Sequence, residues 1–393
     1  MRSATAFRMP DAAAAAPVAP ITVVLVISNL EYGGAQRQVV ELANNFDPSR
    51  VRVHVCSLSS YRPLARELRI PADCQHVIEK RGKYDLSVVP RLAALLKRTR
   101  ADVVHGYLFD AEVAVRLAGK FAGTRVVAGS ERNTNYTLKR VQLGAYRVTR
   151  DWVGLIVANS HAGAAFHRKT LGHDARIYRV IHNGVDTTRF TPGDRGDARV
   201  RLGLDPARPT IGMFASFKRQ KNHPLLFEAA HRLLPAIPDL QLLLVGDELH
   251  GGMHGSSDYK RDTEALIDRL GLRPHCVALG NRDDVDLIYP ACDVTVLPSL
   301  FEGTPNAALE SMACGVPVIV TNVADNAIIA PDGRVGFVVP LERPDVLADR
   351  LQRLLKDPEM AAACGAEARR WAIDEFSTRR LAEKTESVYR ERL

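Results

Sequence analysis

The sequence predicts an α/β protein of two domains, each a doubly wound parallel sheet with helices on both faces. Its 393 residues exceed what one hydrophobic core usually supports. Short β-branched segments alternate with helical ones along both halves, which is the pattern of a parallel sheet. A polar, Gly-rich stretch at 191–197 separates the halves. We therefore expect one domain at 21–185 and a second at 186–377.

The first half opens with Ile21–Ile27, a β-branched run typical of a buried parallel strand. A turn with Gly33 and Gly34 follows, and 35–46 places Val39, Val40 and Leu42 at helical spacing. Strand, glycine-rich loop and helix form the start of a Rossmann-like unit. Further strands are predicted at 51–58, 102–105, 125–128 and 154–158, and helices at 86–100 and 110–122.

The second half repeats this alternation. Strands are predicted at 210–215, 240–245, 277–279, 294–297, 316–320 and 336–339. Helices are predicted at 224–234, 262–270, 284–291, 305–314, 344–356 and 358–375. A Gly/Ser/His-rich insertion at 250–257 is expected to be a mobile loop.

Composition narrows the class of protein. Residues 1–20 are rich in Ala and Pro, and Pro10-Asp11 interrupts the apolar run that a signal peptide needs, so we expect a disordered tail. No run of about 18 apolar residues exists, so no membrane-spanning helix is predicted. The six cysteines lack Cys-x-x-Cys spacing and fit reduced thiols better than a zinc or redox site. These features favour a cytoplasmic protein.

Charge is unevenly distributed. Residues 21–185 carry 25 Lys and Arg against 13 Asp and Glu, a net charge of +12. Residues 186–393 carry 26 basic and 31 acidic side chains. The basic half predicts contact with an anionic partner: membrane lipid, a lipid-phosphate acceptor or nucleic acid. The alternative is an Arg-rich face that contacts only solvent.

The most informative segment is Ser299–Val318, SLFEGTPNAALESMACGVPV. A predicted strand ends before it, Thr304 is a good N-cap, and Pro305 suits the first helical position. The helix start at Asn306 and Ala307 then offers free backbone N–H groups and the positive end of the dipole to a phosphate.

Two carboxylates flank that helix start. Glu302 precedes it, and Glu310 lies about one and a half turns into the helix. One carboxylate can hold a sugar or its leaving group, and the other can accept both hydroxyls of a ribose, as in dinucleotide sites. The pattern therefore suits a nucleotide sugar.

This Glu-x7-Glu segment resembles the motif of the retaining glycosyltransferases of family 4, also called group 1. The resemblance extends from Ile21 across nearly the whole chain. It includes Gly33-Gly34-Ala35-Gln36, Val157-Ala158-Asn159-Ser160, His182-Asn183-Gly184-Val185-Asp186, Val245-Gly246-Asp247, Leu279-Gly280-Asn281-Arg282 and Asp293-Val294. It implies the GT-B fold, in which two Rossmann-like domains face each other across a cleft. The second domain would bind the donor and the first the acceptor, and the helix in 378–393 would pack back onto the first.

The resemblance also implies roles for single residues. Glu302 and Glu310 match the two motif carboxylates, and Lys221 matches a Lys that contacts the donor phosphate. The family usually has an Arg five residues before that Lys; here the position is Ser216, and Lys218 could supply the charge. Arg282 matches a position close to the nucleobase, with a surface Arg as the alternative. Gly33 and Gly34 match the loop whose amides approach the donor phosphates.

The first-domain side of the cleft matches less well. Relatives often carry His-x-His, or a later His, in the loop aimed at the donor sugar. This chain has His105, Tyr107 at the second place and Asp110 at the later one, so both His105 and Asp110 are candidate catalytic residues. Arg132 resembles an acceptor-side residue that could bind a phosphate or carboxylate; its alternative is a structural ion pair.

No metal or other cofactor is expected. Asp284-Val285-Asp286 looks like a metal motif, but it opens a predicted helix, where the helix dipole alone favours acidic residues. No Gly-x-Gly-x-x-Gly follows a predicted strand, which argues against a dinucleotide oxidoreductase.

We therefore predict a retaining glycosyltransferase of polysaccharide, lipopolysaccharide or glycolipid assembly. Its expected partners are a nucleotide sugar and a saccharide or lipid-linked acceptor, with no nucleic acid. The basic half adds an expected attachment to the anionic inner face of the plasma membrane. The alternatives are a nucleotide-sugar epimerase on the same fold, a glycoside hydrolase that uses Glu302 and Glu310, and a non-catalytic binding module.

Overall fold

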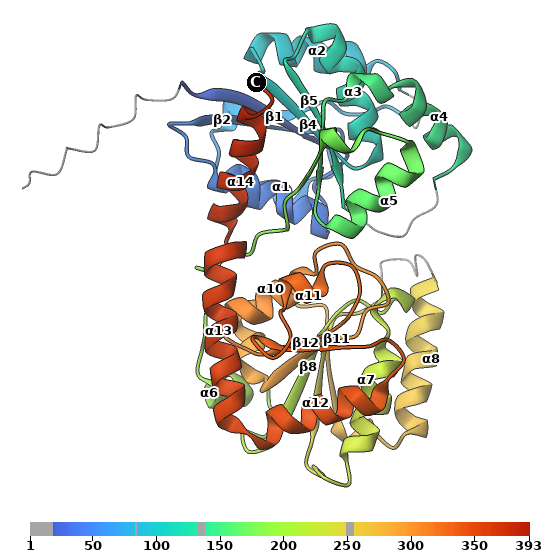
Figure 1. Ribbon diagram of the computed structural model, residues 1–393, viewed down its shortest axis with the longest axis vertical. Helices are drawn as coiled ribbons and strands as arrows, with labels where there is room; N and C mark the ends of the chain where they lie inside the picture. The colour runs from blue at the N-terminus through green and yellow to red at the C-terminus, as the bar shows by residue number, and fades with distance from the viewer. Residues whose placement is uncertain (1–18, 83–84, 133–137, 249–254) are drawn as a thin grey trace, which may run out of the picture.

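The computed structural model describes residues 19–82, 85–132, 138–248 and 255–393, which form two α/β domains (Figure 1). The first contains a seven-stranded parallel sheet of order β3-β2-β1-β4-β5-β6-β7. Its strands are β1 (Ile21–Ile27), β2 (Val51–Ser57), β3 (Gln75–Val77), β4 (Val103–Tyr107), β5 (Val126–Glu131), β6 (Leu155–Ala158) and β7 (Tyr178–Val180).

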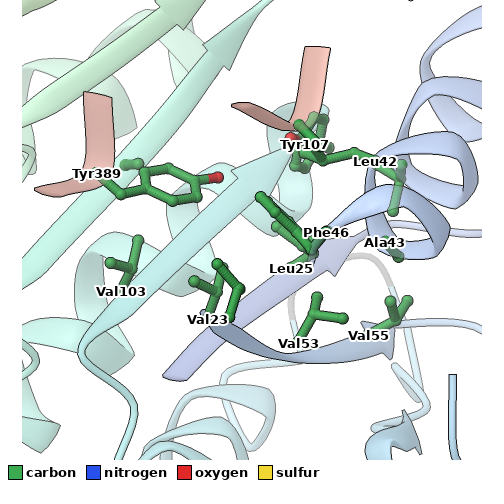
Figure 2. Close-up of a cluster of buried hydrophobic side chains, with 14 of the residues drawn as sticks. Val23, Leu25, Leu42, Ala43, Phe46, Val53, Val55, Val103, Tyr107 and Tyr389 are labelled. Carbon is green, nitrogen blue, oxygen red and sulfur yellow. The ribbon is translucent and has the colours of Figure 1, made fainter. Parts of the chain in front are cut away.

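Helices cover both faces of this sheet. They are α1 (Gly34–Asn45), α2 (Val88–Thr99), α3 (Phe109–Ala122), α4 (Arg140–Val148) and α5 (His161–Leu171). The β1 run predicted from sequence is a central strand, and Val23 and Leu25 on it are fully buried. Figure 2 shows them packed with Val53, Val103 and other side chains in the core.

The second domain contains a six-stranded parallel sheet of order β10-β9-β8-β11-β12-β13. Its strands are β8 (Thr210–Phe214), β9 (Gln241–Val245), β10 (Cys276–Gly280), β11 (Val294–Leu297), β12 (Val318–Thr321) and β13 (Gly336–Val339). Its helices are α6 (Arg195–Arg201), α7 (His223–Leu233), α8 (Ser256–Arg269), α9 (Val285–Ile288), α10 (Asn306–Ala313), α11 (Asn326–Ile329), α12 (Pro344–Lys356) and α13 (Pro358–Phe376).

Both sheets reverse their strand order once, between β1 and β4 and between β8 and β11. In open α/β sheets, ligands bind at the carboxyl ends of the strands beside such a reversal. The predicted fold class, two doubly wound parallel-sheet domains, is confirmed.

The chain crosses between the domains twice, and the two crossings are hydrogen-bonded to each other. The Val185 N–H donates to the Phe376 carbonyl at 2.7 Å, and the Thr378 N–H donates to the Val185 carbonyl at 3.0 Å. Gly184 allows this approach, because a Cβ there would lie 3.0 Å from the Cα of Thr378. A parallel bridge between Val185 and Ser377 therefore holds the two crossings together.

The last helix, α14 (Thr378–Arg390), returns to the first domain and packs on α1 (Figure 1). Tyr389 is fully buried there, with its ring 6.5 Å from that of Phe46. Figure 2 shows it among the side chains of the sheet. Glu386 forms an ion pair with Arg50 at 2.8 Å. The C-terminal helix thus supplies part of the first domain's core.

Most predicted elements are present, but β3, β7, α4, α5, α6 and α11 were not predicted, and α6 begins inside the polar stretch 191–197 that was expected to separate the domains. The two strands have three residues each and are defined by pairing at the sheet edges, which no run of residues signals. The helix predicted at 262–270 begins earlier, at Ser256, and α9 has only four residues. The expected tail (1–18) and most of the expected mobile loop (249–254) lie outside the described residues.

In the part of the chain that the structure describes, no helix is both long enough and apolar enough to cross a bilayer.

Candidate functional site

A cavity of about 620 Å³ lies between the two domains. The second domain lines it with the residues that follow β8, β9 and β10, and with the start of α10. Arg37 and Gln38 of α1 line it from the first domain, and the 184–190 crossing forms another wall. The cavity therefore lies at the strand ends where the topology predicts a ligand.

Gly246 shapes the floor of this interdomain cavity. Its φ of 129° is one that only glycine adopts readily. A Cβ at this position would lie 2.2 Å from the carbonyl oxygen of Ala215. Glycine therefore allows the ends of β8 and β9 to approach each other beneath the cavity.

Glu310 lines the same cavity from α10. Its Oε2 accepts a hydrogen bond from the Tyr289 hydroxyl at 2.8 Å, and the Tyr289 ring stacks on Phe214 at 3.7 Å. Burial raises the pKa of the Glu310 carboxyl, and the Tyr289 hydrogen bond and the Arg189 charge oppose that rise. A carboxylate held in this way can accept the two adjacent hydroxyls of a ribose.

The start of α10 differs from the prediction. The helix begins at Asn306, and Pro305 occupies the N-cap position without a side-chain capping bond. Thr304 is therefore not the cap: its hydroxyl donates instead to the Asn159 carbonyl of the first domain at 2.5 Å. The helix start remains open to the cavity, which Asn306 and Ala307 line.

The glycine-rich loop lies opposite this helix start. A Cβ added to Gly34, the first residue of α1, would lie 3.7 Å from Nδ2 in the side chain of Asn306. Gly33 is the N-cap of α1, also without a side-chain capping bond. Two helix N-termini, one from each domain, thus approach each other at the cleft, and both favour an anion.

Glu302 and Lys221 form a close ion pair. The Lys221 ammonium lies 2.5 Å from Glu302 Oε1, and the Ser299 hydroxyl donates to the same oxygen at 2.7 Å. Lys218 lies near them: burial lowers the pKa of its ammonium, and the charge of Lys221 lowers it further. The Lys218 ammonium has no ion-pair partner among the described residues. Two cations and one carboxylate thus gather where the β8–α7 loop meets the segment before α10.

Arg132 contacts the interdomain crossing. Its Nη2 donates to Asn183 Oδ1 at 2.7 Å, and the Asn183 amide donates to Asn306 Oδ1 at 2.7 Å. Gly303 packs against the same segment, because a Cβ there would lie 3.0 Å from the carbonyl oxygen of Arg132. Arg132 therefore links the first domain to the helix start through Asn183, and its role at the acceptor stays a prediction.

His105 is in the first-domain core and only 1% exposed. Its Nδ1 lies 2.6 Å from the Tyr389 hydroxyl, and its Nε2 lies 2.8 Å from the Ser130 hydroxyl. Burial lowers the pKa of His105 to about 3, and the Arg132 charge contributes. Both ring nitrogens thus have protein partners, because this side chain points to the face that α14 covers.

Asp110 is exposed at the start of α3 and forms an ion pair with Lys80 at 2.7 Å. Neither Asp110 nor His105 lines the interdomain cavity. Between them, Leu108 has a φ of 68°, a strained conformation for a non-glycine residue and one that clusters at functional sites. Which first-domain residue acts in catalysis stays a prediction.

The sequence of this chain matches two family models. Residues 194–371 match the model described as glycosyl transferases group 1. Residues 32–189 match the model of glycosyltransferase family 4. Together the matches span both domains.

The chain belongs to the group 1 glycosyltransferases.

Similar proteins include a D-inositol 3-phosphate glycosyltransferase of Rhodococcus jostii, 33% identical over 60% of this chain and 52% of that protein. The chain thus aligns with about half the length of that relative. The UDP-Gal:alpha-D-GlcNAc-diphosphoundecaprenol alpha-1,3-galactosyltransferase of Escherichia coli is 28% identical over 78% of this chain and 79% of its own. The crystal structure of Anabaena HepE in complex with UDP superposes with a TM-score of 0.82, at 20% identity, over 94% of this chain and 100% of the other.

The two carboxylates of this glycosyltransferase that resemble a metal motif point to different partners. Asp284 pairs with Arg282 at 2.6 Å, and Asp286 pairs with Arg189 at 2.6 Å. Arg282 lines the interdomain cavity, and its contact with the nucleobase stays a prediction. The prediction that the protein needs no metal remains untested.

Asp325 is a residue of this glycosyltransferase that sequence reasoning missed. Its Oδ2 lies 2.8 Å from His161 Nδ1 and 2.8 Å from His182 Nε2, and it accepts the His161 N–H at 2.8 Å. Its Oδ1 accepts the Ala162 N–H at 3.2 Å. Asp325 belongs to the second domain, so its carboxylate binds the first turn of α5 across the domain boundary.

The ligand atoms of His161, His182 and Asp325 lie within 4.8 Å of one another, as those of a metal site would. In this arrangement, hydrogen bonds already engage both carboxylate oxygens. We therefore interpret the cluster as a link between the domains. Its only sequence signal is an Asp before a short helix, which is too common to be informative.

Proposed function

We propose that this protein transfers a sugar from a nucleoside-diphosphate sugar, with UDP-sugars as the first donors to test, to a saccharide or lipid-linked acceptor, with retention of the anomeric configuration. The observation that carries the proposal is the partly buried Glu310 beside the open start of α10 in the interdomain cavity. The printed name of the E. coli relative, which includes UDP-Gal and a diphosphoundecaprenol acceptor, supports these substrate classes.

The proposed chemistry follows from charge. Breaking the bond to the nucleoside diphosphate builds negative charge on the phosphate and positive character on the sugar. Lys221, Lys218 and the start of α10 would stabilise the leaving diphosphate, and the groups fixed around it would orient both substrates. Glu310 would hold the ribose. Glu302, which Lys221 and Ser299 contact, would hold the donor sugar.

The hydrolase alternative fits this geometry less well. A retaining glycosidase needs its two carboxyl groups to face each other about 5–5.5 Å apart across one bond. Glu310 bonds Tyr289 in the cavity wall, whereas Glu302 bonds Lys221 and is not part of that wall. Donor consumption in the absence of any acceptor would instead favour the epimerase.

The test is a thermal-shift panel of UDP, GDP, ADP and TDP and their sugars. A ligand at about 100 times its Kd stabilises a protein by roughly 2.7 kcal/mol. We expect one nucleotide to raise the Tm by several degrees, Glu310→Ala to abolish the shift, and the exposed Glu228→Ala in the same domain to preserve it. A flat response to all four nucleotides would contradict the proposal.

We also infer attachment to the inner face of the plasma membrane, in cell-surface polysaccharide, lipopolysaccharide or glycolipid assembly. The +12 charge of residues 21–185 supports it. Binding to phosphatidylglycerol vesicles should weaken strongly between low and physiological salt. Absent or salt-insensitive binding would remove this support.

A further inference from the structure

The first domain contains a second cavity, of about 590 Å³. We call it the α3 groove, because Phe109, Val113 and Leu117 of α3 form its central wall. Residues from the starts of α2 and α4 form its sides, including Val89 and Ala145. Its volume is that of a pocket for a small organic molecule, commonly 300–1,000 Å³.

The wall of the α3 groove is an apolar stripe that the described residues leave partly exposed. Phe109, Val113 and Leu117 are spaced four residues apart, so they share one face of α3, and each remains partly exposed. Such a stripe normally packs against another element. At the mouth, Leu86 is 76% exposed and Val141 67% exposed. Contiguous exposed apolar surface of this kind marks a binding site.

Cationic groups surround this apolar wall. Lys80 and Lys139 line the groove, and its acidic residues are already paired: Asp110 with Lys80 at 2.7 Å and Asp85 with Arg91 at 3.2 Å. No ion pair involves Lys139 within the described ranges. Because Lys80 is paired with Asp110, Lys139 is the cation that the groove offers to a ligand with an apolar body and an anionic head.

The α3 groove lies on the same edge of the sheet as the interdomain site. Phe109 begins α3 directly after β4, at the carboxyl ends of the strands. Arg132, at the end of β5, lies on that edge and contacts Asn183, which contacts Asn306 in the wall of the interdomain cavity. The Phe109 end of the groove wall and the interdomain cavity thus lie on the same edge of the sheet.

We propose that the α3 groove binds the hydrocarbon chain of a lipid-linked acceptor, and that Lys139 beside it contacts the phosphate of that acceptor. The occupant is the acceptor and not a bilayer lipid, because the groove adjoins the edge where the donor sugar must be received. The inference rests on the proposed function for the class of acceptor.

Calorimetric titration with octyl and decyl phosphate below their micelle concentrations tests the proposal. Two added methylenes in an apolar groove should lower the Kd on the order of tenfold. Leu117→Arg, which places a charge in the wall, should raise the Kd for decyl phosphate at least tenfold. Phe121→Arg is the matched control: it lies on the same helix, is 65% exposed and is outside the groove.

Ala145→Trp is a second variant, which fills the groove without burying a charge and should weaken decyl phosphate binding equally. Equal affinity in Leu117→Arg and Phe121→Arg, or no chain-length dependence, would overturn the proposal. UDP titrated into the same samples reports on the donor site alone. Loss of UDP binding would therefore count against the proposed function, whereas loss of decyl phosphate binding alone would count against the groove. If Leu117→Arg weakened binding to phosphatidylglycerol vesicles but not to decyl phosphate, the groove would hold bilayer lipid, and the proposal would be wrong.

Discussion

Replacing Asp325 by Ala tests how firmly the two domains are joined. The substitution removes four hydrogen-bond contacts to His161, Ala162 and His182, three at 2.8 Å and one at 3.2 Å. The carboxylate is only 3% exposed. Removing one partner of a buried charged cluster typically costs about 3–5 kcal/mol. At roughly 2–4 °C per kcal/mol for a domain of this size, we expect the Tm to fall on the order of 10 °C.

The assay is thermal unfolding followed by calorimetry, with Asp332→Ala as the control. Asp332 is an exposed carboxylate in the same domain that accepts one hydrogen bond, from the Val338 N–H. Its removal should change the free energy of unfolding by about 0.5 kcal/mol or less. If Asp325→Ala melted within 1 °C of that control, the contacts of Asp325 would not hold the domains together.

The stabilisation that Asp325 provides should also depend on pH. Burial favours a higher pKa for Asp325, but the hydrogen bonds from His182 and His161 outweigh it and hold the pKa well below its usual value. A lowered pKa stabilises the fold above the unfolded-state value of about 3.9, and the contribution is lost as the pH falls below it. The Tm gap between wild type and Asp325→Ala should therefore shrink as the pH falls below about 4.

Four further outcomes are expected. Burial raises the pKa of Glu310 above its usual value of 4.5, so UDP affinity should begin to fall above that pH as the solution is acidified. In calorimetry, Glu310→Gln should show only the pH dependence that the nucleotide phosphates cause. Identical pH profiles for the wild type and the variant would contradict this. Lys221→Ala should lower kcat/KM about 100-fold or more in donor-turnover assays, and a loss under threefold would exclude its role at the leaving group. Tyr389→Phe, which deprives His105 of its 2.6 Å partner, should reduce the free energy of unfolding in urea by about 1 kcal/mol without changing UDP affinity; altered UDP binding would show that α14 acts on the site. Gly246→Ala should destabilise by about 2–3 kcal/mol, because its Cβ would meet the Ala215 carbonyl; wild-type stability would show that the β8 and β9 ends can separate.

The parts of the site that could be predicted are those that a short stretch of sequence specifies. Glu302, Glu310 and the start of α10 lie within one loop and helix, so their order along the chain fixes their order in space. The central strands could also be predicted from their β-branched runs, because each strand is buried on both faces.

The contacts that the sequence could not reveal involve partners far away in sequence. Thr304 satisfies the local rule for an N-cap, yet its hydroxyl donates a hydrogen bond to the Asn159 carbonyl of the other domain. His105 fits the position of a catalytic residue, but Tyr389, 284 positions later, occupies its Nδ1. Asp325 acts through His161 and His182, which no local pattern connects to it.

The position of α14 has a consequence for the order in which the protein matures. Leu381, Val388 and Tyr389 belong to the core of the first domain, yet the ribosome adds them after the entire second domain. During synthesis, which usually lets N-terminal domains fold first, this first domain must wait with part of its core uncovered. The second domain can finish earlier, so the half that is translated first is completed last.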